Sequence, residues 1–489
     1  MANDSNKFQA IISHCKEYGF IFPSSEIYDG LQAVYDYGQM GSELKKNIKD
    51  YWWKSMTQLQ DNIVGIDAAI FMHPTTWKAS GHVDNFNDPM IDNKDSKKRY
   101  RVDHLIEAFA EEQSANGNEQ LAKDVLQQMD ALLAQDDFAG LKTLIESNKI
   151  KCALSGTSNW TDIRQFNLMF STEFGSTVSA DDEDNKVYLR PETAQGIFVN
   201  FLNVQKTGRM KVPFGIAQIG KAFRNEIVAR QFIFRMREFE QMEMQFFCRP
   251  GTQKEWFQYW KEARQKWHTD LGIPAEKYRW HKHLKPAFYA DNAGDIEFDF
   301  PFGFKELEGI HSRTDYDLKQ HQEFSKKKMQ YFDNDVDPAT GKPYGNYIPY
   351  VIETSIGLDR MFLAVVSHAY EEQDLSTADK PDSRVVLKFP PKLAPIKLAV
   401  LPLTKKDGLP EIAEQIVNDC RSHFRCFYEE KDSIGKRYRR MDALGTPFCV
   451  TVDHQTKEDN TVTIRHRDSM EQERVAIADL KTIVLNAIN

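Results

Sequence analysis

Hydrophobic and polar residues follow two spacings along this chain, and each spacing predicts a different element. In the segment 358–369, apolar residues recur every three or four positions, which predicts a helix with one buried face. In the segment 215–247, polar and apolar residues alternate, which predicts two strands joined by a short loop near 228–231. The strand before 358 is expected to place Glu353 and Ser355 on one face.

The predicted hairpin carries charged residues whose side chains are expected to share a face. Arg224 and Glu226 are two positions apart, and on the second strand Arg235, Phe239 and Glu243 follow at intervals of four, which is also an even spacing. Such a face offers cations for phosphates, a ring that can stack on a base, and carboxylates for a metal or an amine. A surface hairpin with paired charges would show the same alternation, so both interpretations stay open.

The remaining pattern divides the chain into three parts. Segments 1–92 and 160–390 predict one large domain that includes a helix over about 43–60, capped by Ser42. The segment 93–159 predicts a helical insertion, with one short helix over 138–147. Strands alternating with helices over 391–489 predict a small α/β domain that ends in a helix over 474–488.

Composition narrows the class of protein only moderately. The chain has 489 residues, 41% of them hydrophobic, which is ordinary for a globular protein with two or three domains. No signal peptide and no membrane-spanning run is evident, and the six scattered cysteines form no CxxC pair. We therefore expect a cytoplasmic protein without a membrane partner.

The charge of the chain is uneven. The net charge of −9 does not suggest nucleic-acid binding. However, the motif GKRYRR at 435–440 gathers four basic residues: Lys436, Arg437, Arg439 and Arg440. A solvated basic loop would look the same, so composition alone leaves RNA binding undecided.

Four motifs together resemble the glycyl-tRNA synthetases of class II. ASGHVDNFNDP at 79–89 is similar to motif 1, and FRNE at 223–226 followed by RMREFEQME at 235–243 is similar to motif 2. RPETAQG at 190–196 and SIGLDR at 355–360 complete the set in the family's order. The resemblance implies an α+β class II fold: an antiparallel sheet flanked by helices, with a helical insertion and an α/β anticodon-binding domain.

The resemblance also implies an activity, glycine–tRNA ligation with ATP. It assigns catalysis to Arg224 and Arg360. It assigns ATP binding to these two arginines together with Asn225, Glu226, Phe234, Arg235, Phe239, Glu306, Leu307, Arg313 and Gly357. The implied glycine-binding residues are Arg101, Glu192, Phe239, Glu243, Glu353 and Ser355.

Further ligands and partners follow from the same resemblance. Glu306 and Glu353 are expected to hold magnesium with ATP, and Glu306 is expected to share a strand face with Phe304 and Glu308. Many relatives carry paired cysteines where this chain has only Cys152, so no zinc is expected. The basic cluster would bind tRNA(Gly), and motif 1 implies a homodimer.

Three other functions compete with this interpretation. A class II synthetase for another amino acid would share the fold but not the RPETAQG motif. A non-catalytic accessory relative would usually lack the arginines of motifs 2 and 3, whereas Arg224 and Arg360 are both present. A general ATP-dependent ligase would leave the C-terminal domain unexplained.

Overall fold

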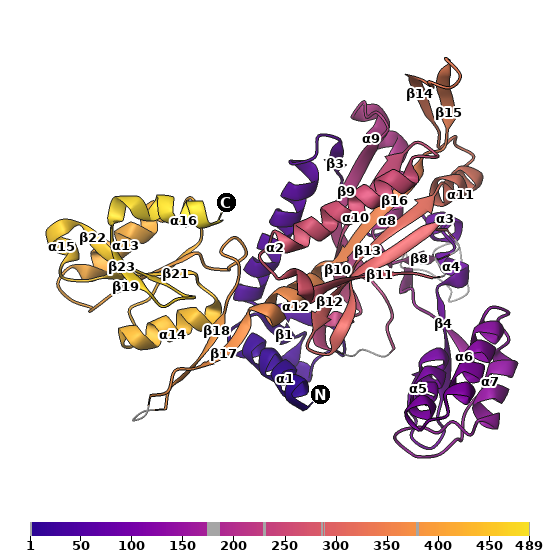
Figure 1. The fold of residues 1–489 in the computed structure, drawn as a ribbon, viewed down its shortest axis with the longest axis horizontal. Coiled ribbons are helices and arrows are strands. Elements are labelled where there is room, and N and C mark those ends of the chain that lie inside the picture. The colour runs from indigo at the N-terminus through magenta and orange to yellow at the C-terminus, as the bar shows by residue number, and fades with distance from the viewer. Residues whose placement is uncertain are drawn as a thin grey trace. The chain divides into compact units, whose positions relative to one another are not determined.

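The chain folds into two compact units in a computed structural model (Figure 1). The structure describes residues 2–173, 186–227, 231–284, 287, 289–377 and 381–488. Unit 1 comprises Met1–Ala68, Gly196–Lys221 and Gln231–Asn489, and unit 2 comprises Ala69–Gln195 and Ala222–Arg230. Most of the predicted hairpin loop at 228–231 lies outside the described residues.

A seven-stranded sheet forms the centre of unit 1, in the order β11-β12-β13-β16-β10-β9-β3. Antiparallel neighbours include β10 with β16, β16 with β13, and β13 with β12, whereas β3 and β9 run parallel. Their bounds are β3 Ile63–Gly65, β9 Phe214–Phe223, β10 Glu238–Cys248, β11 Tyr278–Lys282, β12 Asn292–Phe300, β13 Gly303–Thr314 and β16 Tyr350–Gly357. This mostly antiparallel sheet confirms the predicted fold class.

Three helices cover one face of this sheet: α2 (Gln39–Thr57), α10 (Gln253–Thr269) and α12 (Leu358–Ala369). The sheet contributes Met242, Met244 and Phe246, which alternate along β10 and are fully buried in the shared core. The predicted helix over 358–369 is confirmed. The apolar face of this helix is buried because it packs against the sheet.

A β-bulge in β13 changes which side chains face that core. The pairing with β12 skips Leu307, because Glu308 pairs with Ile296 and Glu306 pairs with Glu297. Leu307 and Glu308 are therefore both buried on the core side, whereas the Glu306 side chain is 53% exposed. The prediction that Phe304, Glu306 and Glu308 share one face is wrong, since strict alternation does not continue through a bulge.

Glu308 is an acid inside the core, and α10 supplies its partners. Its carboxylate accepts hydrogen bonds from Arg264 Nε at 2.6 Å and from His268 Nε2 at 2.7 Å. Burial lowers the pKa of His268, although Glu308 opposes this shift. We infer that His268 is neutral, with its proton on Nε2, so that Arg264 neutralises Glu308.

The start of α2 is set by close packing rather than by the predicted Ser42 cap. The helix begins at Gln39, and Ser42 lies inside it with its hydroxyl bonded to the Gln39 carbonyl. Gly41 in the first turn lies against the backbone of Phe20. A Cβ atom at this position would stand 1.9 Å from the Phe20 carbonyl oxygen, so only glycine fits.

The remaining elements of the N-terminal and central parts of unit 1 are short. They are α1 (Ala2–Glu17), β1 (Ile21–Pro23), β2 (Tyr35–Tyr37), α8 (Ala194–Val199, which begins in unit 2), α9 (Phe201–Thr207), α11 (Tyr316–Ser325), β14 (Tyr331–Val336) and β15 (Pro343–Tyr347). Short 3-10 helices lie at Glu26–Tyr28, Phe232–Phe234 and Ala275–Lys277. No helix among the described residues is both long and apolar enough to span a membrane.

The C-terminal part of unit 1 contains a separate five-stranded sheet with the order β20-β19-β21-β22-β23. Its elements are β19 Leu398–Pro402, α13 Leu409–Cys420, β20 Cys426–Tyr428, α14 Ile434–Leu444, β21 Phe448–Val452, α15 Thr456–Asp459, β22 Thr461–His466, β23 Gln472–Ala476 and α16 Leu480–Ile488. A hairpin of β17 (Tyr370–Asp374) and β18 (Ser383–Leu387) precedes it. The helix predicted over 474–488 is wrong at its start, because 472–476 pair with β22.

Unit 2 contains a three-helix cluster with its own apolar core. Its helices are α5 (Val102–Ala115), α6 (Glu119–Leu133) and α7 (Phe138–Ser147), and α7 has the predicted bounds. The same unit contains α3 (Pro74–Ala79), α4 (His82–Asn85), β4 (Asn87–Asp92), β5 (Arg99–Arg101), β6 (Arg164–Asn167), β7 (Ser171–Glu173) and β8 (Lys186–Tyr188).

The packing of Gly41 generates a prediction for stability. Gly41→Ala is expected to lower the free energy of unfolding by about 1–3 kcal/mol, because the new methyl group meets rigid backbone. Gly435→Ala in α14 is the matched control. A Cβ atom there meets nothing within 4 Å, so this variant should gain up to about 1 kcal/mol from helix propensity. Thermal and urea unfolding of both variants measure the difference; equal midpoints would contradict the packing argument.

Candidate functional site

Polar side chains form rows across the face of the large sheet that points away from α2, α10 and α12. One row is fixed by strand register: Glu243 on β10 pairs with Ser355 on β16, which pairs with Gly309 on β13. Gly309 then pairs with Asp295 on β12. Gly309 has no side chain, and the His311 ring lies over this position, with its Cε1 and Nε2 atoms 3.2 Å from where a Cβ atom would stand.

A second row lies two residues away from the first on each of the same strands. Gln245 on β10 pairs with Glu353 on β16, and Glu353 pairs with His311 on β13. The predicted shared face of Glu353 and Ser355 is therefore confirmed.

Glu353 is the most strongly bound carboxylate on this face. It accepts hydrogen bonds from Gln245 Nε2 at 2.7 Å, His311 Nδ1 at 2.8 Å and Arg313 Nη1 at 2.9 Å. Burial would raise its pKa, but the charge of Arg313 and the bond from His311 lower the pKa well below its usual range. Glu353 is therefore an anion at every pH at which the protein is expected to work.

Arg313 braces Glu353 and is itself held on two sides. Its Nε and Nη2 donate to the two carboxylate oxygens of Asp317 at 2.9 and 3.0 Å. The Tyr289 ring lies 4.2 Å from its guanidinium carbon, and the residue is only 4% exposed. This geometry gives Arg313 a bracing role, and it does not support direct contact with a triphosphate.

Gln245 links two carboxylates of neighbouring rows. Its amide nitrogen donates to Glu243 Oε1 and to Glu353 Oε2, both at 2.7 Å. Glu243 is 1% exposed, and Ser355 stands opposite it with its hydroxyl accepting from Gln241 at 3.3 Å. A buried carboxylate facing a hydroxyl is a set of hydrogen-bond acceptors that suits a small ammonium group.

Arg360 is positioned by the start of α12, where Gly357 is the N-cap. Its Nη1 pairs with Glu306 Oε2 at 3.1 Å, and its guanidinium carbon lies 4.4 Å from the centre of the Phe234 ring. Phe234 is fixed by edge contacts with Phe300 and Phe302. The structure therefore groups Arg360, Glu306 and Phe234, as the ATP-binding prediction requires.

Three other predicted ATP contacts differ in accessibility. The side chain of Leu307 is 1% exposed in the core, so only its backbone is available for a ligand. Arg235 and Phe239 are both half-buried; Arg235 follows the 3-10 turn Phe232–Phe234, and Phe239 is the second residue of β10.

The remaining residues predicted to bind ATP or glycine belong to unit 2. Arg224 and Glu226 do not share a strand face, because β9 ends at Phe223. Arg224 Nε instead donates to the Pro191 carbonyl at 3.0 Å. The Asn225 backbone N–H donates to the Leu168 carbonyl at 2.7 Å.

Glu192 and Arg101 have partners within the same unit. Glu192 lies two residues before the helix that begins at Ala194. Its Oε1 is 3.6 Å from His82 Nε2 and accepts a hydrogen bond from Gln195 Nε2 at 3.0 Å. Arg101 pairs with Asp103 and, at 3.2 Å, with Asp88. The hydrogen bond with Asp103 outweighs burial and raises the pKa of Arg101.

The basic cluster lies on α14 rather than in the solvated loop considered above. Arg437 is 2% exposed and donates to the carbonyls of Pro402 and Glu429, so its predicted contact with tRNA is wrong. Arg439 pairs with Asp382 at 2.7 Å, and Arg440 pairs with Glu429 at 2.6 Å. Lys436 is exposed.

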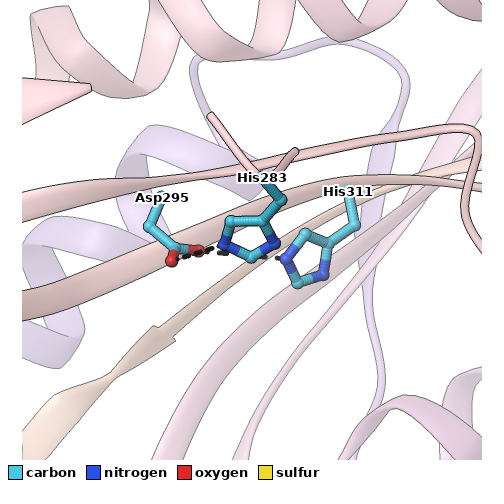
Figure 2. A group of neighbouring side chains, drawn as sticks. All are labelled: His283, Asp295 and His311. Atoms are coloured by element: carbon cyan, nitrogen blue, oxygen red, sulfur yellow. Dashed lines mark hydrogen bonds and ion pairs between the residues drawn. The ribbon is translucent and has the colours of Figure 1, made fainter. Parts of the chain in front are cut away.

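Sequence reasoning missed a group of side chains beside Glu353, namely His283, Asp295 and His311 (Figure 2). Its signal was present as the pair His281 and His283, which are two positions apart in the sequence. The partners come from two further strands, however, and only the sheet register reveals that they meet.

Three family models match different parts of this chain. Residues 170–369 match the family "tRNA synthetase class II core domain (G, H, P, S and T)". Residues 88–125 and 117–168 match "Glycyl-tRNA synthetase insertion domain 1", and residues 397–487 match "Anticodon binding domain".

Full-length relatives are similar at high identity. A protein of Chlorobaculum tepidum named glycine–tRNA ligase is 55% identical over 95% of this chain and 96% of its own length. Proteins of the same name from Treponema denticola and Staphylococcus haemolyticus are each 51% identical, over 99% and 98% of both chains, respectively.

The bonds to Glu353 generate a prediction for pH dependence. Glu353→Gln should destabilise unit 1 by about 3 kcal/mol near neutral pH, because Arg313 and His311 lose a buried anion. Since the folded-state pKa is lowered, the stability that Glu353 contributes is fully present above its unfolded value of 4.5 and is lost as pH falls below it.

Thermal unfolding of wild type and variant at several pH values measures this difference. The gap between their midpoints should be largest near neutral pH and should shrink in acid. The control is Glu276→Gln, which changes an exposed acid and should leave the midpoint unchanged. A gap that stayed constant down to about pH 3 would contradict the assignment.

Proposed function

Because the chain belongs to the glycyl-tRNA synthetases of class II, we propose that the polar face of its large sheet binds and activates glycine. The activity is that of a glycine–tRNA ligase. Glycine and ATP give glycyl-adenylate and pyrophosphate, and glycine is then transferred to the 3′-terminal ribose of tRNA. The observation that carries the assignment to this face is the buried Glu243 opposite Ser355.

The first step needs positioning and charge stabilisation more than proton transfer. The carboxylate of glycine is already a nucleophile when it attacks the α-phosphate, so no general base is required. We assign Arg224 and Arg360 to the stabilisation of negative charge on the reacting phosphates and on the attacking carboxylate. Arg235 would bind the β- and γ-phosphates, and Phe239 would stack on adenine.

Recognition of glycine depends on its ammonium and carboxylate groups, since it has no side chain to hold. Glu243, Glu192 and Ser355 would accept hydrogen bonds from the ammonium. Gln245 fixes the Glu243 carboxylate, and Glu353 fixes Gln245 in turn. We therefore give Glu353 a positioning role, because three protein donors already occupy its carboxylate. Arg101 would act near the glycine carboxylate.

ATP brings a requirement for magnesium, which this proposal assigns to Glu306. Carboxylate oxygens are the ligands that magnesium prefers, and the Glu306 side chain remains 53% exposed. When bound, magnesium supplies charge neutralisation on the phosphates. The sequence also suggested Glu353 as a ligand, but its saturated hydrogen bonding favours Glu306. Asn225, Glu226, Phe234, Gly357 and the backbone of Leu307 would complete the ATP contacts.

The second substrate is tRNA(Gly), and the proposal extends to its binding. Lys436 is exposed, and Arg439 and Arg440 lie beside it in ion pairs that phosphates could replace. Motif 1 favours a homodimer, and six free cysteine thiols are compatible with the cytoplasm.

A substitution at Arg224 tests the catalytic assignment. Arg224→Ala should lower glycine-dependent ATP–pyrophosphate exchange by at least about 100-fold, because a charge that stabilises the transition state is lost. Arg164→Ala is the matched control, since Arg164 is an exposed arginine of the same unit. Exchange at a near wild-type rate in Arg224→Ala would overturn its assigned role.

Exchange with each of the twenty amino acids, without tRNA, tests the substrate. Glycine alone should support exchange, because a face that fits glycine would reject the additional methyl group of alanine by steric clash. Exchange with a different amino acid would retain the class of enzyme and reject glycine recognition by this face. No exchange with any amino acid, in folded protein that binds tRNA, would favour a non-catalytic relative.

A further inference from the structure

Three metal-ligand side chains meet on the site face of the large sheet. They are His283, just after β11, Asp295 on β12 and His311 on β13, and one ligand atom of each lies within 4.8 Å of the others. Figure 2 shows the two imidazole rings and the carboxylate pointing towards one another. The backbone N–H of His283 donates to the Ala293 carbonyl at 3.0 Å, which holds it beside β12.

The distances between the three side chains fit a site that an ion could draw together. His283 Nε2 lies 2.8 Å from Asp295 Oδ2, and His311 Nε2 lies 3.9 Å from Asp295 Oδ1. Ligand atoms around a tetrahedral zinc ion stand about 3.3 Å apart, given bond lengths near 2.0 Å. Side-chain movements of less than about 1 Å would therefore bring all three to bonding distance.

His311 provides the strongest indication of a missing partner. Its Nδ1 is held by Glu353 Oε1 at 2.8 Å, so this nitrogen carries a proton. Its Nε2 is excluded from solvent and has no hydrogen-bond partner among the described residues. A histidine whose outer nitrogen donates to a carboxylate, while the other nitrogen presents a lone pair, is the usual arrangement of a metal ligand.

The charge around the group also favours a cation. Asp295 is 8% exposed, and the negative charge of Glu306 acts on it in addition to its burial. Arg313 is the cation bonded to Glu353, but Asp317 already neutralises it. An ion beside His311 would compensate the remaining carboxylate.

We propose that His283, Asp295 and His311 bind a divalent transition-metal ion, with zinc as the preferred ion. Two imidazoles and one carboxylate are a zinc-type ligand set, whereas magnesium takes oxygen ligands. Three protein ligands leave at least one coordination position open. The expectation of no zinc considered cysteine ligands only, and this site has none. The proposal does not depend on the activity described above.

Cobalt(II) is the probe, because its visible spectrum reports the coordination of nitrogen ligands directly. Full-length protein without a polyhistidine tag is treated with chelator and then titrated with Co²⁺, followed by Zn²⁺ in competition. We expect one equivalent of Co²⁺ to bind with visible absorption bands, Zn²⁺ to displace it, and millimolar Mg²⁺ to leave it bound.

Matched variants locate the site. Asp295→Asn keeps the size of the side chain but removes its charge, and His311→Ala removes the Nε2 ligand atom. Each substitution should weaken Co²⁺ binding at least about tenfold. His281→Ala is the control, since His281 lies two residues from His283 but pairs with Glu297 at 3.1 Å. Circular dichroism shows whether each variant is folded. No absorption bands in wild type, or equal loss in the His281 variant, would show that the group is only an ion pair.

Discussion

The carboxylate of Glu353 is the interaction on which the polar face of the sheet depends. Its three donors come from β10 and β13, the two strands that flank its own, so this one anion fixes side chains across the centre of the sheet. Without it, Arg313 would retain Asp317 and Gln245 would retain Glu243, but His311 Nδ1 would lose its hydrogen bond. Buried carboxylates are costly unless every oxygen is bonded, and here the bonding is complete enough to keep Glu353 ionised.

The bulge at Leu307 gives two neighbouring acids opposite environments. Glu308 enters the core and is neutralised by Arg264 on α10, which ties the helix to the sheet. Glu306 pairs with Arg360 at 3.1 Å, and its side chain is 53% exposed. One extra residue in a strand therefore separates an acid of the core from the exposed acid that we propose as the magnesium ligand. A strand without the bulge would turn both carboxylates to the same face.

Local pattern predicted the elements that bury a continuous apolar face, and motifs predicted the class of fold. The helix over 358–369 is an example, because the spacing of its apolar residues matches the face that is buried against the sheet. The start of α2 could not be predicted, since it depends on Gly41 meeting the distant backbone of Phe20. Arg437 shows the same limit: its basic neighbours suggested a surface, but the carbonyls of Pro402, at the end of β19, and of Glu429 bind its guanidinium inside the fold. The meeting of His283, Asp295 and His311 likewise required the register of three strands.

A ligand as small as glycine places a particular demand on such a face. Only a few contacts with such a ligand are possible. Each acceptor must therefore be held in place before the ligand binds, because the entropy cost of ordering that side chain would otherwise offset the binding free energy. In the proposed site, Glu243 meets this demand because Gln245 holds it, and Gln245 is held in turn by Glu353. Rigidity in the sheet therefore supports the proposed selection of glycine by its charged groups.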